Sequence, residues 1–194
     1  MEETSLEQKK VWIKKAKKTA NEVISQIKKS FDKVIVGKAI WKLMMIPGLL
    51  FEKAVAVTAK NSIEKIQRIE NRVWKYLLGL GGYTTVEALR GEIGASMMLS
   101  RVMETMLLFV VDTLSSNFEQ LKTYMNHEIE MGKGQWIRTI NEYREKLGLS
   151  WIDMREIEKK TLKKKIREFD TQIWKEEMMQ KPSRKWYRVG KEDI

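Results

Sequence analysis

Apolar residues recur at helical spacing along most of this chain. The clearest run is Ile63, Ile66, Ile69, Val73 and Leu77, whose spacings of three, three, four and four residues match one face of a helix. Gly79 follows the run, and glycine accepts the left-handed backbone of a helix C-terminus without steric cost. Thr84 and Glu87 then form a capping-box pattern, which predicts the start of the next helix.

The N-terminal part shows the same period. Ser5 and Gln8 form another capping-box pattern, and the apolar positions after them predict one long helix to about Ser30: Trp12, Ala16, Ala20, Val23, Ile27 and Phe31. We expect Gly37 to separate this helix from the next, which begins near Lys38. That second helix is apolar almost all round, so we expect it to be the buried centre, with a kink or restart at Pro47.

The second half predicts further helices. Ser96 is a candidate cap for a long helix to about Leu114, and its methionines are expected in the core, because apolar residues of this kind are usually buried. A helical pattern continues to Asn126, and Gly132-Lys133-Gly134 predicts a loop. A short helix around Ile137 and Ile140 ends at Gly148, and Ser150 or Asp153 begins a last helix that ends before Pro182.

These patterns predict an all-α protein, a bundle of about six to eight helices. We expect two parts: a helical bundle over residues 1–82, and a C-terminal helical region over residues 83–194 packed on it. The most apolar windows, residues 39–51 and 105–111, fall short of the roughly 20 residues that a spanning helix needs. The polar N-terminus does not resemble a signal peptide, which favours an intracellular protein, cytoplasmic or nuclear.

Charge is the next feature that bears on function. The 194 residues carry a formal net charge of +11 and no cysteine, which excludes disulfides and thiolate metal sites. Residues 1–35 hold 9 basic and 5 acidic side chains, residues 36–131 hold 11 and 10, and residues 132–194 hold 17 and 11. Both ends are therefore basic around a nearly neutral middle, a distribution that attracts polyanions but also serves solubility alone.

Basic side chains gather on three of the predicted helices, off their apolar faces. We predict that they bind nucleic acid through its phosphates, the alternative being ordinary solvated surfaces. The candidates are Lys14, Lys15, Lys17, Lys18 and Lys28 on the first helix, Lys65, Arg68, Arg72 and Lys75 on the helix of Ile63 to Leu77, and Lys163, Lys164 and Arg167 on the last. Aromatic and basic residues also alternate in KPSRKWYRVGK, residues 181–191, as in segments that stack on bases; a docked or frayed terminus is the alternative.

The stretch IEKIQRIENR, followed by LLGL, a threonine turn and ALRGEIG, resembles a segment of LINE-type (non-LTR) retrotransposon reverse transcriptases. That family reads roughly IEKLQRIQNR, LLGL, a Thr-Pro turn and ALRGELG; Val86 stands here in place of the proline. The similarity extends more weakly from about Ser5 to Lys191, including Pro47-Gly48-Leu49-Leu50-Phe51-Glu52, which lacks the family's tyrosine and glycine. The resemblance implies a thumb and post-thumb region that follows the catalytic palm.

The chemistry of the family's palm is not expected in this chain. The palm motif holds two metal ions on paired aspartates, and no two aspartates are adjacent here. His127, Glu128 and Glu130 are the one grouping with metal or acid-base character, and we interpret them as a solvated loop. The glycines of residues 79–82 are not a phosphate loop, because no Gly-Lys-Ser/Thr follows. We therefore expect no enzyme activity and no cofactor or metal.

Two other classes remain open beside a helical module that binds RNA or an RNA/DNA template-primer. The first is a helical protein-interaction or self-associating module derived from a retroelement, since seven tryptophans and twelve methionines leave room for an exposed apolar patch. The second is a helix-turn-helix protein that reads DNA sequence, which the length of the predicted helices disfavours.

Overall fold

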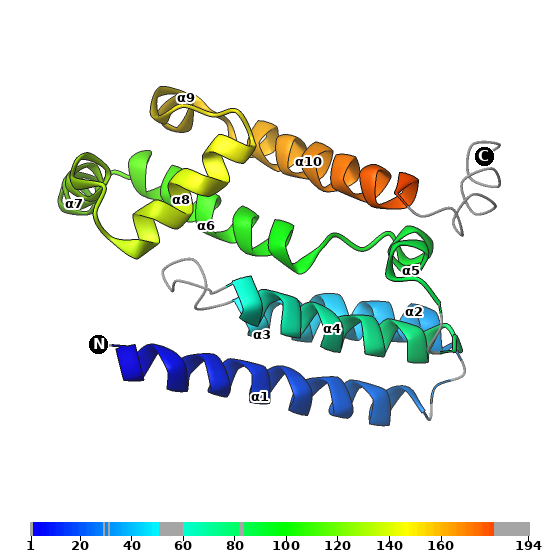
Figure 1. Cartoon of the computed structure of the whole chain (residues 1–194). Helices are drawn as coiled ribbons and strands as arrows, with labels where there is room; N and C mark the ends of the chain where they lie inside the picture. The colour runs from blue at the N-terminus through cyan, green and yellow to red at the C-terminus, as the bar shows by residue number, and fades with distance from the viewer. Residues whose placement is uncertain (1, 29, 31, 51–59, 82–83, 181–194) are drawn as a thin grey trace. The chain divides into compact units, whose positions relative to one another are not determined.

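The computed structural model describes residues 2–28, 30, 32–50, 60–81 and 84–180, and within these ranges every regular element is helical (Figure 1). Side chains of residues 2–9, 44, 45, 49 and 60 are outside the description. The prediction of an all-α, multi-helix protein is confirmed. The predicted cap of Ser5 and Gln8, the side chain of Phe31 and the tail of residues 181–191 lie outside the described residues.

The described residues form a series of helices. In chain order they are α1 (Glu2–Ile27), α2 (Lys33–Ile40), the π-helical turn η1 (Trp41–Met45), α3 (Ile46–Leu50), α4 (Lys60–Leu77), α5 (Val86–Ile93), α6 (Met98–Leu114), α7 (Glu119–Met131), α8 (Gln135–Lys146), α9 (Trp151–Glu156) and α10 (Lys159–Met179). The first of two compact units holds α1 to α5 and α10 from Thr171 onward; the second holds α6 from Leu99, α7, α8, α9 and α10 up to Asp170. The predicted division at residue 82 stays a prediction, because residues 82 and 83 are not described.

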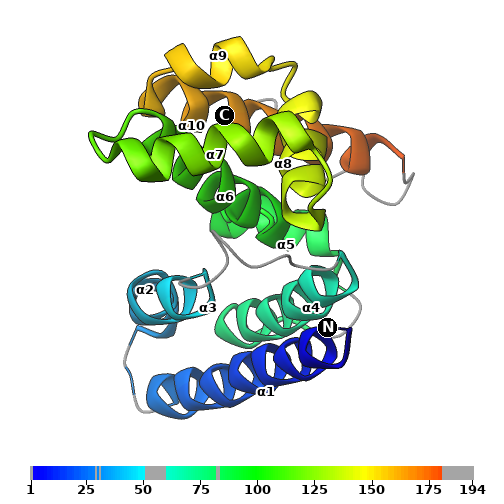
Figure 2. The ribbon, with the colours of Figure 1, turned by 90° about the vertical axis from the view of Figure 1, so that its left-hand side faces the viewer.

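The first unit is built on α1 and α4, which run parallel and side by side, while α2, η1 and α3 return in the opposite direction (Figures 1 and 2). Both predicted apolar faces are buried between these helices. They are Trp12, Ala16, Ala20, Val23 and Ile27 of α1, and Ile63, Ile66, Ile69, Val73 and Leu77 of α4. Gly79, at φ +64°, ends α4 as predicted, and the amide of Leu80 donates to the carbonyl of Lys75 at 2.9 Å.

A polar contact lies inside this unit. The Glu70 side chain is fully buried, and its Oε1 accepts a hydrogen bond from the indole Nε1 of Trp41 at 2.7 Å. The Trp41 ring also packs against that of Trp74, with 5.4 Å between ring centroids. This contact ties η1 to α4 across 29 residues of sequence.

The predictions for the second helix were wrong in two respects. Gly37 does not separate two helices; it lies inside α2, since α1 ends at Ile27 and α2 begins at Lys33. Nor is the described part of this element buried all round, because Gly37 and Trp41 are buried while Leu43 is 77% exposed. The side chains of residues 44, 45, 49 and 51–59 lie outside the description. The restart expected at Pro47 is present as the π turn, in which the amide of Ile46 donates to the carbonyl of Trp41. A proline cannot donate in the helical register, and the wider turn accommodates it.

Gly37 is needed for close packing of α2. A methyl group at this position would lie 2.5 and 2.6 Å from the two terminal carbons of Leu77, which is itself buried. We expect Gly37→Ala to lower the free energy of unfolding by about 1–3 kcal/mol, because overpacking outweighs the gain in helix propensity. Gly48→Ala is the control: its added methyl meets nothing within 4 Å, so we expect no loss. Urea unfolding of the two variants measures the difference, and equal stabilities would contradict the proposed packing role.

The second unit is organised on α6, with the part of α10 up to Asp170 antiparallel to it (Figure 1). Val102, Met103, Met106, Leu107 and Val110 are buried, so the prediction that the methionines of α6 form core is confirmed. Ser100 Oγ donates to Asp170 Oδ1 at 2.7 Å, and Lys163 Nζ lies 3.8 Å from Glu104 Oε1. The predicted helix stop at Gly148 and the loop around Gly132 are both present, each glycine having positive φ.

Several predicted helix ends need correction. Thr85, not Thr84, is the N-cap of α5, and its side chain makes no capping hydrogen bond. Ser96 does not begin a helix; α6 starts at Met98 and ends at Leu114, before a separate α7. The predicted helix start at Ser150 is confirmed, because Ser150 is the N-cap of α9 and forms a capping box with Asp153. Hydrogen bonds from the Ser150 side chain and backbone hold the pKa of Asp153 below its usual value.

The final helical stretch also divides. Ile157 has an extended backbone, so α9 and α10 are separate helices and not the single predicted one. Among the described residues, no single helix is long and apolar enough to cross a membrane; α5 and α6 satisfy such a test only when they are joined across their bend.

Candidate nucleic-acid interface

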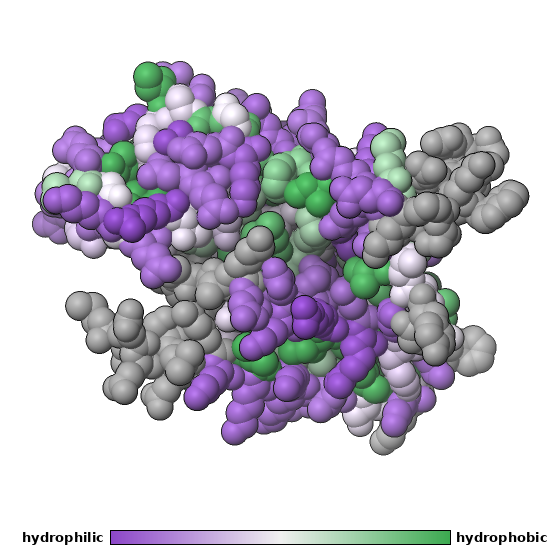
Figure 3. All heavy atoms as spheres, in the orientation of Figure 1, coloured by the Kyte–Doolittle hydropathy of each residue, from purple (hydrophilic) through white to green (hydrophobic). Residues whose placement is uncertain are grey.

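A groove of about 390 Å³ runs on the surface between α1 and α4. Its lining combines cations and apolar carbons. The residues are Ile13 and Lys17 of α1, and Lys65, Arg68, Ile69 and Arg72 of α4. Figure 3 shows apolar atoms between the hydrophilic side chains that cover these two helices. Four of the twelve predicted nucleic-acid-binding residues therefore meet at one place.

Helix geometry explains why the cations line up. Lys65, Arg68 and Arg72 are separated by three and four residues, so they form one row along α4, beside the buried row. Because α1 runs parallel to α4, Lys17 lies beside this row. Arg72 also contacts Asn21 of α1, whose Oδ1 accepts a hydrogen bond from Arg72 Nη2 at 2.6 Å.

Four cations give the groove a positive field. Among the described residues, Lys17, Lys65 and Arg68 make no ion pair, and all three side chains are exposed. The carbons of Ile13 and Ile69 beside them exclude some water, which strengthens the interaction of these cations with an anion. A chain of phosphates would relieve the repulsion between the four like charges.

The other predicted lysines of α1 surround the groove without lining it. Lys14, Lys15, Lys18 and Lys28 are all exposed. Lys18 lies 3.9 Å from Glu22, an exposed pair that contributes little energy. Lys17 is thus the first-helix lysine that faces α4, while its neighbours extend the basic surface around the helix.

The remaining predicted residues are placed less favourably for a phosphate. Lys75 is half-buried and has another partner inside the protein. Lys163 and Lys164 lie near carboxylates, those of Glu104 and Glu168, each at 3.8 Å. Arg167 is exposed, and together with these two lysines it lies in the second unit. The α10 cations are therefore partly neutralised.

The grouping with possible metal chemistry is not in a loop, as predicted, but on α7. His127 is exposed and Glu128 is half-buried there. In the described part of the chain, no three histidine or acidic side chains are arranged to hold a metal ion.

Sequence reasoning missed Ile13 and Ile69 as parts of the groove lining, and Asn21 as the partner of Arg72. Ile69 belongs to the predicted apolar face, at its edge toward α1, and is 9% exposed. Ile13 directly follows the buried Trp12. An apolar residue beside the buried face of α1 was the signal that could have revealed its place in the groove. Asn21 gives no such clue, since its role depends on the packing of α1 against α4.

Comparison with known protein families, curated proteins and solved structures finds no match for this chain. The resemblance to LINE-type reverse transcriptases therefore rests on the sequence stretches quoted above and enters the functional argument as an expectation.

Proposed function

We propose that this chain is a non-catalytic, nucleic-acid-binding helical module whose α1–α4 groove holds the phosphate backbone of RNA or of an RNA/DNA duplex. The observation that carries the proposal is the meeting of Lys17, Lys65, Arg68 and Arg72 around one groove. Flexible cations of this kind neutralise phosphates without reading the bases, so the binding has little sequence preference.

The family resemblance favours RNA or an RNA/DNA duplex as the nucleic acid that is bound. Three of the four groove cations lie within IEKIQRIENR, the stretch most similar to the thumb region of LINE-type reverse transcriptases. A thumb grips the template-primer duplex beside a separate catalytic palm. On this proposal the chain acts inside the cell, and it contributes to RNA-directed DNA synthesis only when it works with a palm domain.

Binding of a labelled RNA hairpin and of an RNA–DNA duplex of equal length, across a series of salt concentrations, tests the proposal. Each phosphate held by a cation adds about 0.9 to the slope of log K against log salt, so four contacts predict a slope of roughly −3 to −4. Absence of binding to both probes at low salt would sink the proposal. A salt-independent affinity would show that the phosphates are not what the protein holds.

The α1 lysines give a finer test of where the nucleic acid lies. Lys17→Gln should weaken binding more than Lys15→Gln, because Lys17 lines the groove and Lys15 does not. Replacing Lys14, Lys15, Lys17 and Lys18 together by glutamine should make the salt dependence of RNA binding shallower still. Equal effects of the two single changes would indicate a diffuse basic surface instead of the groove.

A second candidate function is a helical protein-interaction or self-associating module. The observation that favours it is the exposed apolar side of α2 and η1, where Ile35, Val36 and Leu43 are 69%, 36% and 77% exposed. Light scattering distinguishes the two functions. An oligomer that persists at high salt and has no affinity for RNA would favour this alternative.

A further inference from the structure

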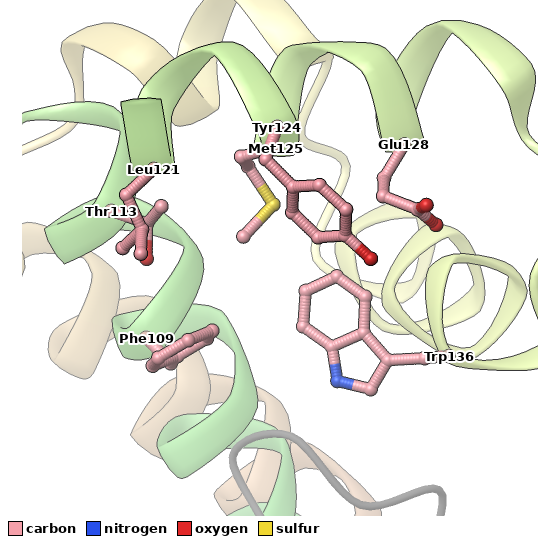
Figure 4. Close-up of a pocket in the computed structure, with 7 residues that line it drawn as sticks. All are labelled: Phe109, Thr113, Leu121, Tyr124, Met125, Glu128 and Trp136. Atoms are coloured by element: carbon pink, nitrogen blue, oxygen red, sulfur yellow. The ribbon is translucent and has the colours of Figure 1, made fainter. Parts of the chain in front are cut away.

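A second cavity, of about 300 Å³, lies within the second unit between α6, α7 and α8. Most of its lining is apolar or aromatic, and Figure 4 shows the side chains: Phe109, Thr113, Leu121, Tyr124, Met125, Glu128 and Trp136. Thr113 and Met125 are buried, whereas Tyr124 is 64% exposed and so lies at the mouth. This size is at the lower end of ligand pockets and suits a compact group.

Three aromatic rings from three helices form much of the wall. The rings of Phe109 and Trp136 are nearly perpendicular, at 86°, with 6.3 Å between centroids. Tyr124 lies close to Trp136, with its ring on the same side of α7 as Met125 (Figure 4). The faces of such rings carry partial negative charge and attract cations, most strongly for tryptophan.

Glu128 supplies a full negative charge at this wall. It follows Tyr124 by one helical turn, so the two side chains share one face of α7. Glu128 is the one charged residue among those that line the pocket, and in the described part of the chain its carboxylate makes no ion pair. Glu128 Oε2 lies near Gly134, where an added methyl would be 3.4 Å from it, an ordinary contact distance.

We propose that this pocket binds an alkylated ammonium group, such as the trimethylammonium end of a small molecule or side chain. The cation would contact the faces of the aromatic rings, and Glu128 would supply the opposite charge. Methyl groups on the nitrogen match the apolar lining and reduce hydration, whereas an unmodified ammonium is compact and strongly hydrated. Phosphate-bearing ligands are disfavoured by the carboxylate. The pocket thus differs in charge from the α1–α4 groove, and the proposal does not depend on nucleic-acid binding.

Choline and its neutral isostere 3,3-dimethylbutan-1-ol separate the charge of the ligand from its shape. The intact chain is titrated with each probe, with total chloride held constant, and binding is followed by calorimetry and by the NMR signal of the Trp136 indole. We expect choline to bind at least about tenfold more tightly than the isostere, the effect of a cation over a partly desolvated ring and beside a carboxylate. Equal affinities would overturn the proposal in favour of a purely apolar pocket, as would the absence of choline binding.

Two variants of α7 that each remove one negative charge test where choline binds. Glu128→Gln should weaken choline binding about tenfold, whereas Glu130→Gln, which removes the same charge outside the pocket, should leave it unchanged. Tyr124→Leu keeps an apolar side chain at an exposed position, so it should fold normally and still weaken the binding. Circular dichroism checks the fold of each variant. If Glu128→Gln binds choline as tightly as the unchanged protein, the assignment of the carboxylate is wrong.

Discussion

Replacing Lys65, Arg68 and Arg72 together by glutamine is expected to weaken RNA binding by about 100-fold near 0.1 M salt and to make the salt slope shallower by roughly 2–3. These three residues form one row on α4 along the groove. Each that holds a phosphate releases a counterion on binding, and this release drives affinity most strongly at low salt. Glutamine keeps a long polar side chain, so the change removes charge with little effect on the exposed helix surface.

A matched control removes the same charge elsewhere. Lys133, Arg138 and Arg155 are also one lysine and two arginines, all are exposed, and all lie in the second unit. Their replacement by glutamine lowers the net charge by the same amount and should change the affinity only slightly. Filter binding or fluorescence anisotropy with one RNA hairpin measures both variants. Similar losses in the two would mean that overall charge, and not the α1–α4 groove, attracts the RNA.

The sequence predicts those parts of the fold that depend on residue patterns within a single helix. The buried faces of α1 and α4 follow from a helical period in the sequence, and Gly79 ends α4 because its backbone is left-handed. The α2 segment shows the limit of this reasoning. Its apolar residues surround the helix, and only the packing of α2 against α1 and α4 decides that Gly37 faces inward while Ile35 remains exposed.

The candidate groove was predictable in its parts but not as a site. The row of Lys65, Arg68 and Arg72 can be read from spacing, but the approach of Lys17 depends on the parallel packing of α1 on α4. The same limit applies to α10. The basic neighbours of Lys163 predict a phosphate-binding lysine, whereas the carboxylate beside it is that of Glu104, which lies 59 positions earlier in the chain. Contacts between residues that are distant in the sequence therefore distinguish the cations of the groove from the cations that lie beside carboxylates.

The largest expected effect on stability comes from two tryptophans that differ mainly in one hydrogen bond. Trp41 and Trp74 are 1% and 2% exposed, and their rings are in contact. The Trp41 indole donates to Glu70 at 2.7 Å, whereas the Trp74 indole nitrogen has no hydrogen-bond partner among the described residues. Replacing either ring by phenylalanine removes similar volume. Of the two changes, only Trp41→Phe removes a hydrogen bond to the fully buried carboxyl group of Glu70.

We therefore expect Trp41→Phe to lower the free energy of unfolding by about 1–3 kcal/mol more than Trp74→Phe does, because Glu70 Oε1 loses the indole donor while Oε2 keeps its hydrogen bond from Gln67. Trp74→Phe removes an unsatisfied donor together with part of the ring, and these two effects oppose each other. Urea unfolding monitored by circular dichroism gives both values. In the Glu70→Leu background the extra loss from Trp41→Phe should disappear, because the oxygen that accepts from the Trp41 indole is absent there. Should the difference persist there, ring packing and not the Glu70 contact would be what stabilises the link between η1 and α4.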